Sequence, residues 1–365
     1  MTRSSLDFAA LPGESDDLFA NYLAALAQPT GPIGLRRMIR MTATMTELLL
    51  AQAPAVLERI GATAVLADAV EPSGPLIAAR LGLPCAGVVT GLPLSRDDAV
   101  PPPYVGWRYR DDAWGRFRNR SGYLVAAQLM RPIASVIEAR RRDWRLADRD
   151  TQIATQVAQC PRELDFPRPS RSTALHYGSP WRLPDAEHVA LAGDGRPLIF
   201  CSLGTLQGAR PALFRIMAAA CAAVGARAVI GHGGGLSAAE EASLPGDPLV
   251  RAFWPQRTVL DRCAAAILHG GFNSVLDALA AGIPVMVLPI GFEQPGTAAR
   301  IAHIGAGKVL SPRRLSTASL ARALRDLLDD ERYRNASRRI AGAMAAGGGG
   351  AGAAAIIDAA LTSRA

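Results

Sequence analysis

A group of polar residues in the second half of the chain has the types and spacing to bind a sugar diphosphate. His269 closes the apolar run at residues 264–268, two glycines follow it, and Asn273 and Ser274 come next. Where a strand ends in a glycine turn and a helix begins, free backbone N–H groups and the positive end of the helix dipole meet, and diphosphates bind there. We expect His269 to donate to a phosphate oxygen. Asn273 and Ser274 can cap the helix or contact the second phosphate, and Asp277, one turn further on, can reach ribose hydroxyls.

Each of these residues has an ordinary structural explanation when taken singly. A Gly-Gly turn is usually only a turn, an Asn-Ser pair is usually a helix cap, and a lone histidine is usually structural. A second glycine-rich run, residues 231–235, lacks the Lys-Ser/Thr pair of a phosphate-binding P-loop. We interpret it as a loop and leave a catalytic role for His232 open. The order of the whole set is far more specific than any single member.

That order resembles the signature of the UDP-glycosyltransferase superfamily, glycosyltransferase family 1. The signature has an aromatic residue before a Pro-Gln pair, then His-x-Gly-x-Asn-(Ser/Thr), an acidic residue, Gly-Val-Pro and an (Asp/Glu)-Gln pair. This sequence has a counterpart of each, in the same order, with Gly-Ile-Pro in the place of Gly-Val-Pro. The resemblance implies the GT-B fold, an α/β architecture in which two Rossmann-like domains with parallel sheets face an interdomain cleft.

The same resemblance assigns residues to the parts of a UDP-sugar. The implied contacts are uracil for Phe253 and the backbone of Trp254, ribose for Gln256 and Asp277, diphosphate for Thr205, His269, Gly271, Asn273 and Ser274, and sugar hydroxyls for Glu293 and Gln294. Phe253 stands where plant-type members have tryptophan, so weaker stacking on the base is expected. Gln294 favours glucose as the sugar.

Further phrases resemble the zeaxanthin glucosyltransferases, a group within that superfamily. They occupy residues 34–40, 68–74, 100–107, 165–168 and 202–208. The resemblance implies inverting transfer of glucose from UDP-glucose to a hydroxyl of a carotenoid, with no metal and no cofactor besides the donor substrate. Another lipophilic acceptor, such as a macrolide or a sterol, stays open. So do a catalytically silent UDP-sugar-binding protein and a UDP-sugar 2-epimerase.

The catalytic base of this family is a histidine on the first N-terminal loop, oriented by an aspartate after a later strand. Asp68 corresponds to that aspartate. The base itself has no counterpart, because the first histidine of the chain is His176 and the others are His188, His232, His269 and His303. The resemblance also implies an opening strand–helix–strand segment before residues 6–8, and we expect that the sequence begins at an internal methionine.

Alternating strand and helix patterns are predicted to position these residues in two α/β units. In the first half, strands at 64–67 and 85–89 flank a helix within 72–83. The second half repeats the pattern, with strands at 197–201, 226–230, 264–268 and 284–288 and helices at 212–224 and 274–281. We divide the chain into an acceptor-binding domain at 1–180, with a linker within 160–184, a UDP-sugar-binding domain at 181–350 and a C-terminal helix at 351–365. The glycine run at 347–350 is interpreted as flexible.

The composition is that of a globular protein of two domains. The chain has 365 residues, of which 49% are hydrophobic and 20% charged. It has no charge-free apolar run of about eighteen residues and no apolar segment typical of a secretory signal at its start, so we expect a cytoplasmic protein. The five cysteines have no metal-ligand spacing and are expected to be buried and reduced.

Arginine carries most of the formal net charge of +8 and alternates with aromatic residues at 107–110, 114–120 and 140–145. This pattern is typical of peripheral contact with a membrane, where an enzyme for a lipophilic acceptor would work. A solvated surface with a few packed aromatic side chains is the alternative. Nucleic-acid binding would use the same residue types, but nothing else in the sequence supports it, and we expect none.

Overall fold

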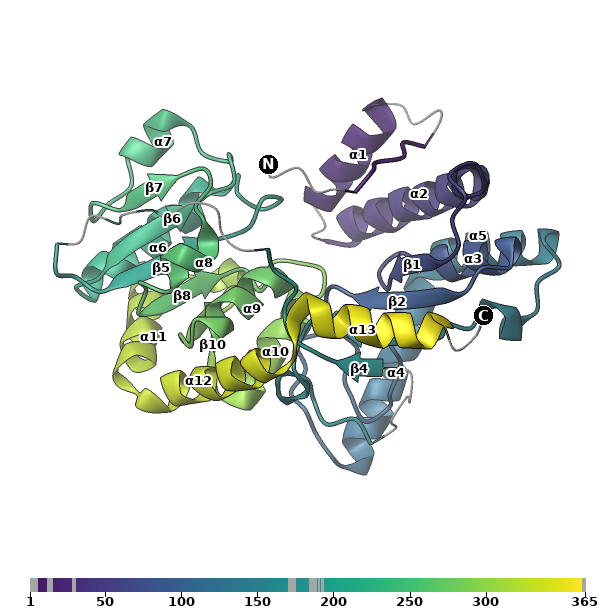
Figure 1. The fold of residues 1–365 in the computed structure, drawn as a ribbon. Coiled ribbons are helices and arrows are strands. Elements are labelled where there is room, and N and C mark those ends of the chain that lie inside the picture. Colours follow the sequence, from purple (N-terminus) through teal and green to yellow (C-terminus); the bar gives the residue numbers. More distant parts are fainter. Residues whose placement is uncertain are drawn as a thin grey trace. The chain divides into compact units, whose positions relative to one another are not determined.

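The structure is a computed structural model, and it describes residues 6–11, 16–27, 31–169, 175–183, 189, 191 and 194–362. These residues form two compact α/β units (Figure 1). Unit 1 contains the described residues up to Val88, residues 126–156 and those from Ile357 onward, and unit 2 contains residues 89–125 and 157–356. The division into acceptor-binding and donor-binding domains at residue 180 is a functional one and stays a prediction.

Unit 1 contains the strand–helix–strand element predicted for the first half. β1 (Val65–Asp68) and β2 (Cys85–Val89) pair in parallel, and α3 (Gly74–Leu81) connects them. The chain can continue into β2 because Gly82 ends α3 in the left-handed conformation, with φ of 67°. This predicted element is therefore confirmed.

The long helix α2 (Gly31–Arg59) organises the rest of unit 1. Its Leu50 packs with Leu76 of α3, and both side chains are almost completely buried. The remaining helices of this unit are α1 (Asp16–Ala27) and α5 (Arg131–Asp143), which both pack on α2, and the 3-10 turn η1 (Asp148–Thr151).

A six-stranded parallel sheet forms the centre of unit 2. Its strands are β5 (Leu198–Ser202), β6 (Arg227–Gly231), β7 (Leu249–Arg251), β8 (Ala265–Leu268), β9 (Val285–Val287) and β10 (Gly307–Val309). The order across the sheet is β10-β9-β8-β5-β6-β7. The strands of its middle are buried throughout, as expected for a parallel sheet covered on both faces. All four strands predicted for this half are confirmed within two residues.

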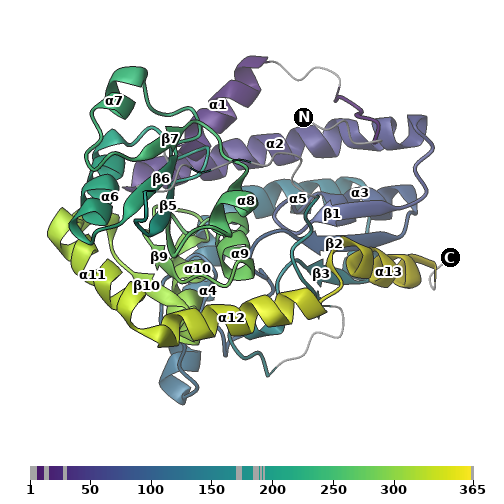
Figure 2. The same cartoon turned by 60° about the vertical axis from the view of Figure 1, so that its left-hand side comes forward.

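Helices pack on this sheet through alternate strand residues. α6 (Pro211–Ala223) and α11 (Thr317–Asp329) lie together (Figure 2) and share a buried core with Ile199 of β5 and Ile267 of β8. α9 (Phe272–Ala280) packs on β8 and β9. The further elements with residues in unit 2 are β3 (Gln156–Ala158), η2 (Arg162–Leu164), β4 (Leu175–Tyr177), α4 (Ala113–Leu129), α7 (Ala238–Ala242), α8 (Gln256–Leu260), α10 (Gln294–Ile304), η3 (Pro312–Arg314), α12 (Glu331–Ala346) and α13 (Gly349–Thr362).

The glycine run at 347–350 is ordered, so the prediction of flexibility is wrong. Helix α13 begins at Gly349, whose N–H donates to the Ser179 hydroxyl at 2.8 Å. Gly347 lies so close to Gly178 that a methyl group in its place would be 2.9 Å from that carbonyl carbon. The glycines allow two segments of backbone to touch, and Ser179 supplies a polar partner at the start of the helix.

The segment predicted as a linker is partly structured, since η2 and β4 lie within it, while residues 170–174 and 184 lie outside the described part of the chain. His188 lies outside it too. All five cysteines are buried and unpaired with one another, as expected. Among the described residues no single helix is long and apolar enough to cross a membrane, and α12 and α13 reach that length and hydropathy only as a pair bent by 49°.

Candidate functional site

The predicted donor residues gather at one edge of the six-stranded sheet. All of them follow β5, β7, β8 or β9, and the carboxyl ends of parallel strands share one edge. From β5 the chain continues to β6 and β7 on one side, whereas β8, β9 and β10 extend to the other side. The position between β5 and β8 is therefore a topological switch point, where open α/β sheets bind their ligands.

Helix α9 begins at the glycine turn after β8 without a side-chain cap. Gly270 has a φ of 90°, which favours glycine, and Gly271 is the N-cap residue. The helix starts at Phe272, two residues earlier than predicted, because the chain changes direction within the two glycines and the helix can begin directly after them. Asn273 and Ser274 lie inside the first turn, so of their two predicted roles the helix cap is wrong, and the phosphate contact stays a prediction. An N-terminus without a side-chain cap offers its N–H groups to anions.

His269 lies at the base of this turn, enclosed by glycines. A methyl group at Gly204 would lie 2.9 Å from its Nε2 atom, and one at Gly271 would lie 2.3 Å from it. Burial lowers the pKa of His269 to about 4, although a hydrogen bond with the Ser202 backbone acts in the opposite direction. The imidazole is therefore neutral at pH 7. Its Nδ1 atom is buried with no partner among the described residues, and such an atom costs about 1–3 kcal/mol.

The two predicted ribose ligands are hydrogen-bonded to each other. Gln256, the first residue of α8, donates from Nε2 to Oδ2 of Asp277 at 2.7 Å. Its Oε1 accepts from the Ser274 hydroxyl at 3.3 Å. A carboxylate accepts several hydrogen bonds at once, so Asp277 can hold Gln256 and also accept from hydroxyl groups. The structure thus brings together three residues that are up to 21 positions apart in the sequence.

Two further residues join this network that sequence reasoning missed. Arg182 donates from Nε to Oδ1 of Asp277 at 2.7 Å, and Gln159 donates from Nε2 to Oδ1 of Asn273 at 2.7 Å. Gln159 Oε1 in turn accepts from Arg182 Nη1 at 2.9 Å. Neither residue belongs to a motif, and no local signal in the sequence marks them.

The loops after β5 and β6 touch through glycines. A methyl group at Gly208 would lie 1.9 Å from the carbonyl oxygen of His232, and one at Gly233 would lie 3.0 Å from Cα of Thr205. Thr205 is exposed on the first of these loops. His232 is almost completely buried and accepts at Nδ1 from the Leu236 N–H, while its Nε2 lies 2.9 Å from Glu241. Its surroundings therefore give His232 a structural role in shaping the loop.

Phe253 and Trp254 follow β7 and differ in their surroundings. The Trp254 indole donates to the Ile230 carbonyl at 2.9 Å, and the Arg251 guanidinium lies over its ring at 4.4 Å. Phe253 is 66% exposed. Its face is accessible to a planar ligand, whereas Trp254 is fixed as part of the fold.

Glu293 and Gln294 lie at the start of α10. Gln294 is buried, and its Oε1 accepts from the N–H groups of Ile290 and Gly291 at 2.8 and 2.9 Å. Its side chain thus shapes the loop after β9, although the amide NH2 group remains a potential donor to a sugar. Burial raises the pKa of Glu293. The pKa of the nearby Tyr104 hydroxyl is also raised, first by burial and then by the negative charge of Glu293.

Asp68 ends β1 in unit 1. Its Oδ1 accepts from the Val70 N–H at 3.1 Å, which closes the turn after the strand. The position at the carboxyl end of a parallel strand is the one expected for a functional carboxylate. Its catalytic role stays a prediction.

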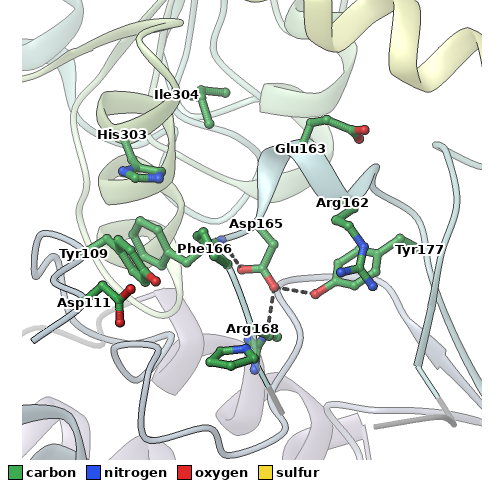
Figure 3. A pocket seen from close by; sticks show the side chains of 12 residues that line it. Tyr109, Asp111, Arg162, Glu163, Asp165, Phe166, Arg168, Tyr177, His303 and Ile304 are labelled. Atoms are coloured by element: carbon green, nitrogen blue, oxygen red, sulfur yellow. Dashed lines mark hydrogen bonds and ion pairs between the residues drawn. The ribbon is translucent and has the colours of Figure 1, made fainter. Parts of the chain in front are cut away.

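A cavity of about 650 Å³ in unit 2 lies around a different carboxylate, Asp165 (Figure 3). Asp165 is paired with Arg168 and Arg300 at 2.7 Å each, and it accepts from the Tyr177 hydroxyl at 2.7 Å. Burial alone would raise the pKa of Asp165, but Arg300 and Arg168 hold it below its usual value. The phrase at 165–168 that contributed to the family resemblance therefore forms a buried ion-pair network. None of the predicted donor residues lines this cavity.

No group of three or more His, Cys, Asp or Glu side chains is arranged to hold a metal ion within the ranges that the structure describes. The prediction that the reaction needs no metal is not tested by this observation and stays a prediction.

Comparison with known proteins identifies similar chains over most of this sequence. The family described as "Erythromycin biosynthesis protein CIII-like, C-terminal domain" matches residues 217–357. A zeaxanthin glucosyltransferase from Pseudescherichia vulneris is 36% identical over 304 residues, covering 81% of this chain and 73% of that protein. A zeaxanthin glucosyltransferase from Pantoea ananas is 33% identical over 329 residues, covering 87% and 76%.

The fold has solved counterparts. The crystal structure of CalG4, the calicheamicin glycosyltransferase, matches with a TM-score of 0.71 at 22% identity, covering 96% of this chain and 85% of that one. The likeness at this identity concerns the fold, and it confirms the predicted α/β GT-B class.

Proposed function

Because the chain belongs to the zeaxanthin glucosyltransferase family of the UDP-glycosyltransferases, we propose that it transfers glucose from UDP-glucose to a hydroxyl of a carotenoid such as zeaxanthin. One observation carries the donor half of this proposal. The network of Asp277, Gln256 and Ser274 lies on and beside the uncapped start of α9. A ribose needs hydrogen-bond acceptors for its hydroxyls, and a diphosphate needs N–H donors. The two sets of groups must lie next to each other.

The reaction we propose is a single displacement with inversion. The acceptor oxygen forms a bond to the anomeric carbon, the bond from that carbon to the β-phosphate oxygen breaks, and UDP leaves with the electron pair. The start of α9, together with a hydrogen bond donated by the neutral His269 imidazole, stabilises the negative charge that develops on UDP. We propose that no metal ion or further cofactor takes part.

The proton of the acceptor hydroxyl must pass to a base. We assign Asp68 as the residue that orients this base, following the family resemblance. The sequence has no histidine before His176, so donor binding is the first property to test on this chain, and turnover is the second.

A catalytically silent UDP-sugar-binding protein is the second candidate, because the network of Asp277, Gln256 and Ser274 would serve binding without transfer equally well. Such a protein would bind UDP through the same residues but would neither transfer nor hydrolyse the sugar. Other lipophilic acceptors, such as a macrolide or a sterol, remain candidates for the transferase.

We also propose peripheral contact with a membrane, where a carotenoid resides. Trp114 and Phe117 on α4 are each 60% exposed, and the arginines Arg116 and Arg120 alternate with them. Exposed aromatic residues among arginines suit the polar boundary of a bilayer. The cytoplasmic location stays a prediction.

Isothermal titration calorimetry of the full chain with UDP tests the donor site. We expect UDP to bind, and Asp277→Asn to weaken UDP and uridine alike by roughly 30-fold or more, because charged hydrogen bonds to ribose are lost. His269→Ala should weaken UDP more than uridine. Arg332→Ala, at an exposed position on α12, is the matched control and should change neither affinity.

Turnover is then tested with UDP-glucose and detergent-dispersed zeaxanthin, and chromatography should show a more polar, glucosylated pigment. UDP binding without transfer or hydrolysis would favour the silent protein. A chain that does not bind UDP, or binds it equally well after Asp277→Asn, would refute the proposed site.

A further inference from the structure

Arg182 occupies a position among the predicted donor residues to which no motif assigns a role. It follows β4 in the segment that precedes the six-stranded sheet, and its partner Asp277 lies 95 positions further along the chain. The side chain is 21% exposed and that of Asp277 is 10% exposed. Its guanidinium contacts residues expected to bind both ribose and diphosphate.

The three nitrogen atoms of this guanidinium are held unequally. Nε bonds Asp277 at 2.7 Å, and Nη1 bonds Gln159 at 2.9 Å and the Trp181 carbonyl at 3.0 Å. Among the residues that the structure describes, Nη2 makes only longer contacts, at 3.2 Å to the side-chain oxygen and 3.3 Å to the carbonyl oxygen of Asn273. Charge-assisted hydrogen bonds of arginine are normally about 2.7–2.9 Å long. Two nitrogens therefore anchor the side chain, and the third is weakly bonded.

The weakly bonded nitrogen points at the first turn of α9. The N-terminal end of a helix carries a partial positive charge, so a guanidinium there is unfavourable unless an anion lies close to both. Asp277 supplies one negative charge, but it lies a turn further along the helix. A diphosphate at the helix start would satisfy the N–H groups of the helix and Nη2 together.

We propose that Arg182 is a further donor-binding residue, with Nη2 donating to the diphosphate while Nε holds Asp277 in place for the ribose. This inference rests on the proposed UDP-sugar site. It adds to that site a positively charged side chain, the Arg182 guanidinium. His269 cannot supply this charge at neutral pH, because burial keeps its pKa near 4. Arg182 would therefore share with the helix start the charge that develops on the leaving UDP.

Titration of the full chain with uridine and with UDP separates the two contacts of Arg182. Arg182→Ala should weaken UDP about 10-fold or more, the usual effect of losing a charged hydrogen bond, and should weaken uridine less than about 3-fold. Arg182→Lys keeps the charge but loses the fork, so an intermediate loss for UDP is expected. Inorganic pyrophosphate should compete with UDP for the wild-type chain and compete less well for Arg182→Ala. Arg215→Ala is the matched control, since Arg215 on α6 bonds Ser243 at 2.9 Å.

The outcomes distinguish this inference from the proposed function. If the wild-type chain binds neither ligand, the proposed donor site fails. If the wild-type chain binds UDP and Arg182→Ala binds it equally well, only the role of Arg182 is overturned. An equal loss for uridine and UDP would show that Arg182 acts through Asp277 alone, and tighter binding would show that it competes with the donor. Either result would overturn the diphosphate contact.

Discussion

Two aspartates of unit 2 are both paired with arginine, yet they serve different purposes. Asp165 and its partner Arg300 each have a side chain that is 1% exposed, and Arg168 and Tyr177 complete the set. Asp277 is 10% exposed, and its partner Arg182 is 21% exposed. The Asp165 carboxylate is fully bonded to side chains of the protein itself. The second, Asp277, lies at the switch point of the sheet, in the proposed donor site, and its ion pair is more exposed than the first.

Replacing Arg300 by methionine tests the enclosed network and should have the largest effect. The change leaves Asp165 with a buried charge and one fewer partner, which typically destabilises a protein by about 3–5 kcal/mol. Urea denaturation followed by circular dichroism measures the change in the free energy of unfolding. Arg332→Met is the control, because the arginine of its ion pair with Asp330 is 90% exposed, and an exposed ion pair contributes little to stability. Equal effects of the two variants would contradict the distinction.

The buried imidazole of His269 predicts a loss of stability in acid. Its pKa falls from 6.5 to about 4 on folding, so between these values the unfolded chain takes up a proton that the folded chain does not. Stability should fall as the pH drops through this window, by up to about 3 kcal/mol at pH 4. Denaturation curves of wild type and His269→Gln measure this, and the variant should have a shallower dependence because it lacks the titrating group. Parallel curves would contradict the assignment to His269.

Phe253 tests the open side of the site and should give the smallest effect. Phe253→Ala removes a ring that is 66% exposed, so the free energy of unfolding should stay within about 0.5 kcal/mol. Affinity for UDP should fall about 5-fold through lost stacking on the base, and Phe253→Trp should raise it. Calorimetry measures both, with Phe117→Ala on α4, which is 60% exposed, as the matched control. An unchanged affinity in both variants would remove Phe253 from the site.

The strands and the glycine turn could be predicted because local physics determines them. Fully buried strands appear as short apolar runs, and the positive φ of Gly270 requires the residue type found there. The start of α9 was predicted two residues late because an Asn-Ser pair is typical of a cap, while the true N-cap is Gly271. The order of loops at the sheet edge followed from the family resemblance and not from periodicity.

Contacts between distant segments could not be predicted. Arg182 and Gln159 reach Asn273 across 91 and 114 positions, and neither has a neighbour in the sequence that indicates this. The prediction that the glycine run at 347–350 is flexible was wrong for the same reason, since the partner of Gly349 is Ser179, 170 positions away. A sequence pattern describes which residues are near one another along the chain, and these three features depend on nearness in space.

The slot that holds His269 limits how the proposed donor site can be redesigned. A Cβ atom added at Gly204 or at Gly271 would lie within 3 Å of the His269 ring. Neither glycine can therefore be replaced without displacing the imidazole. Attempts to accept a different nucleotide or sugar would therefore have to alter the rim, at positions such as Phe253 and Glu293. A residue larger than glycine in place of Gly204 or Gly271 would push the His269 ring out of its place.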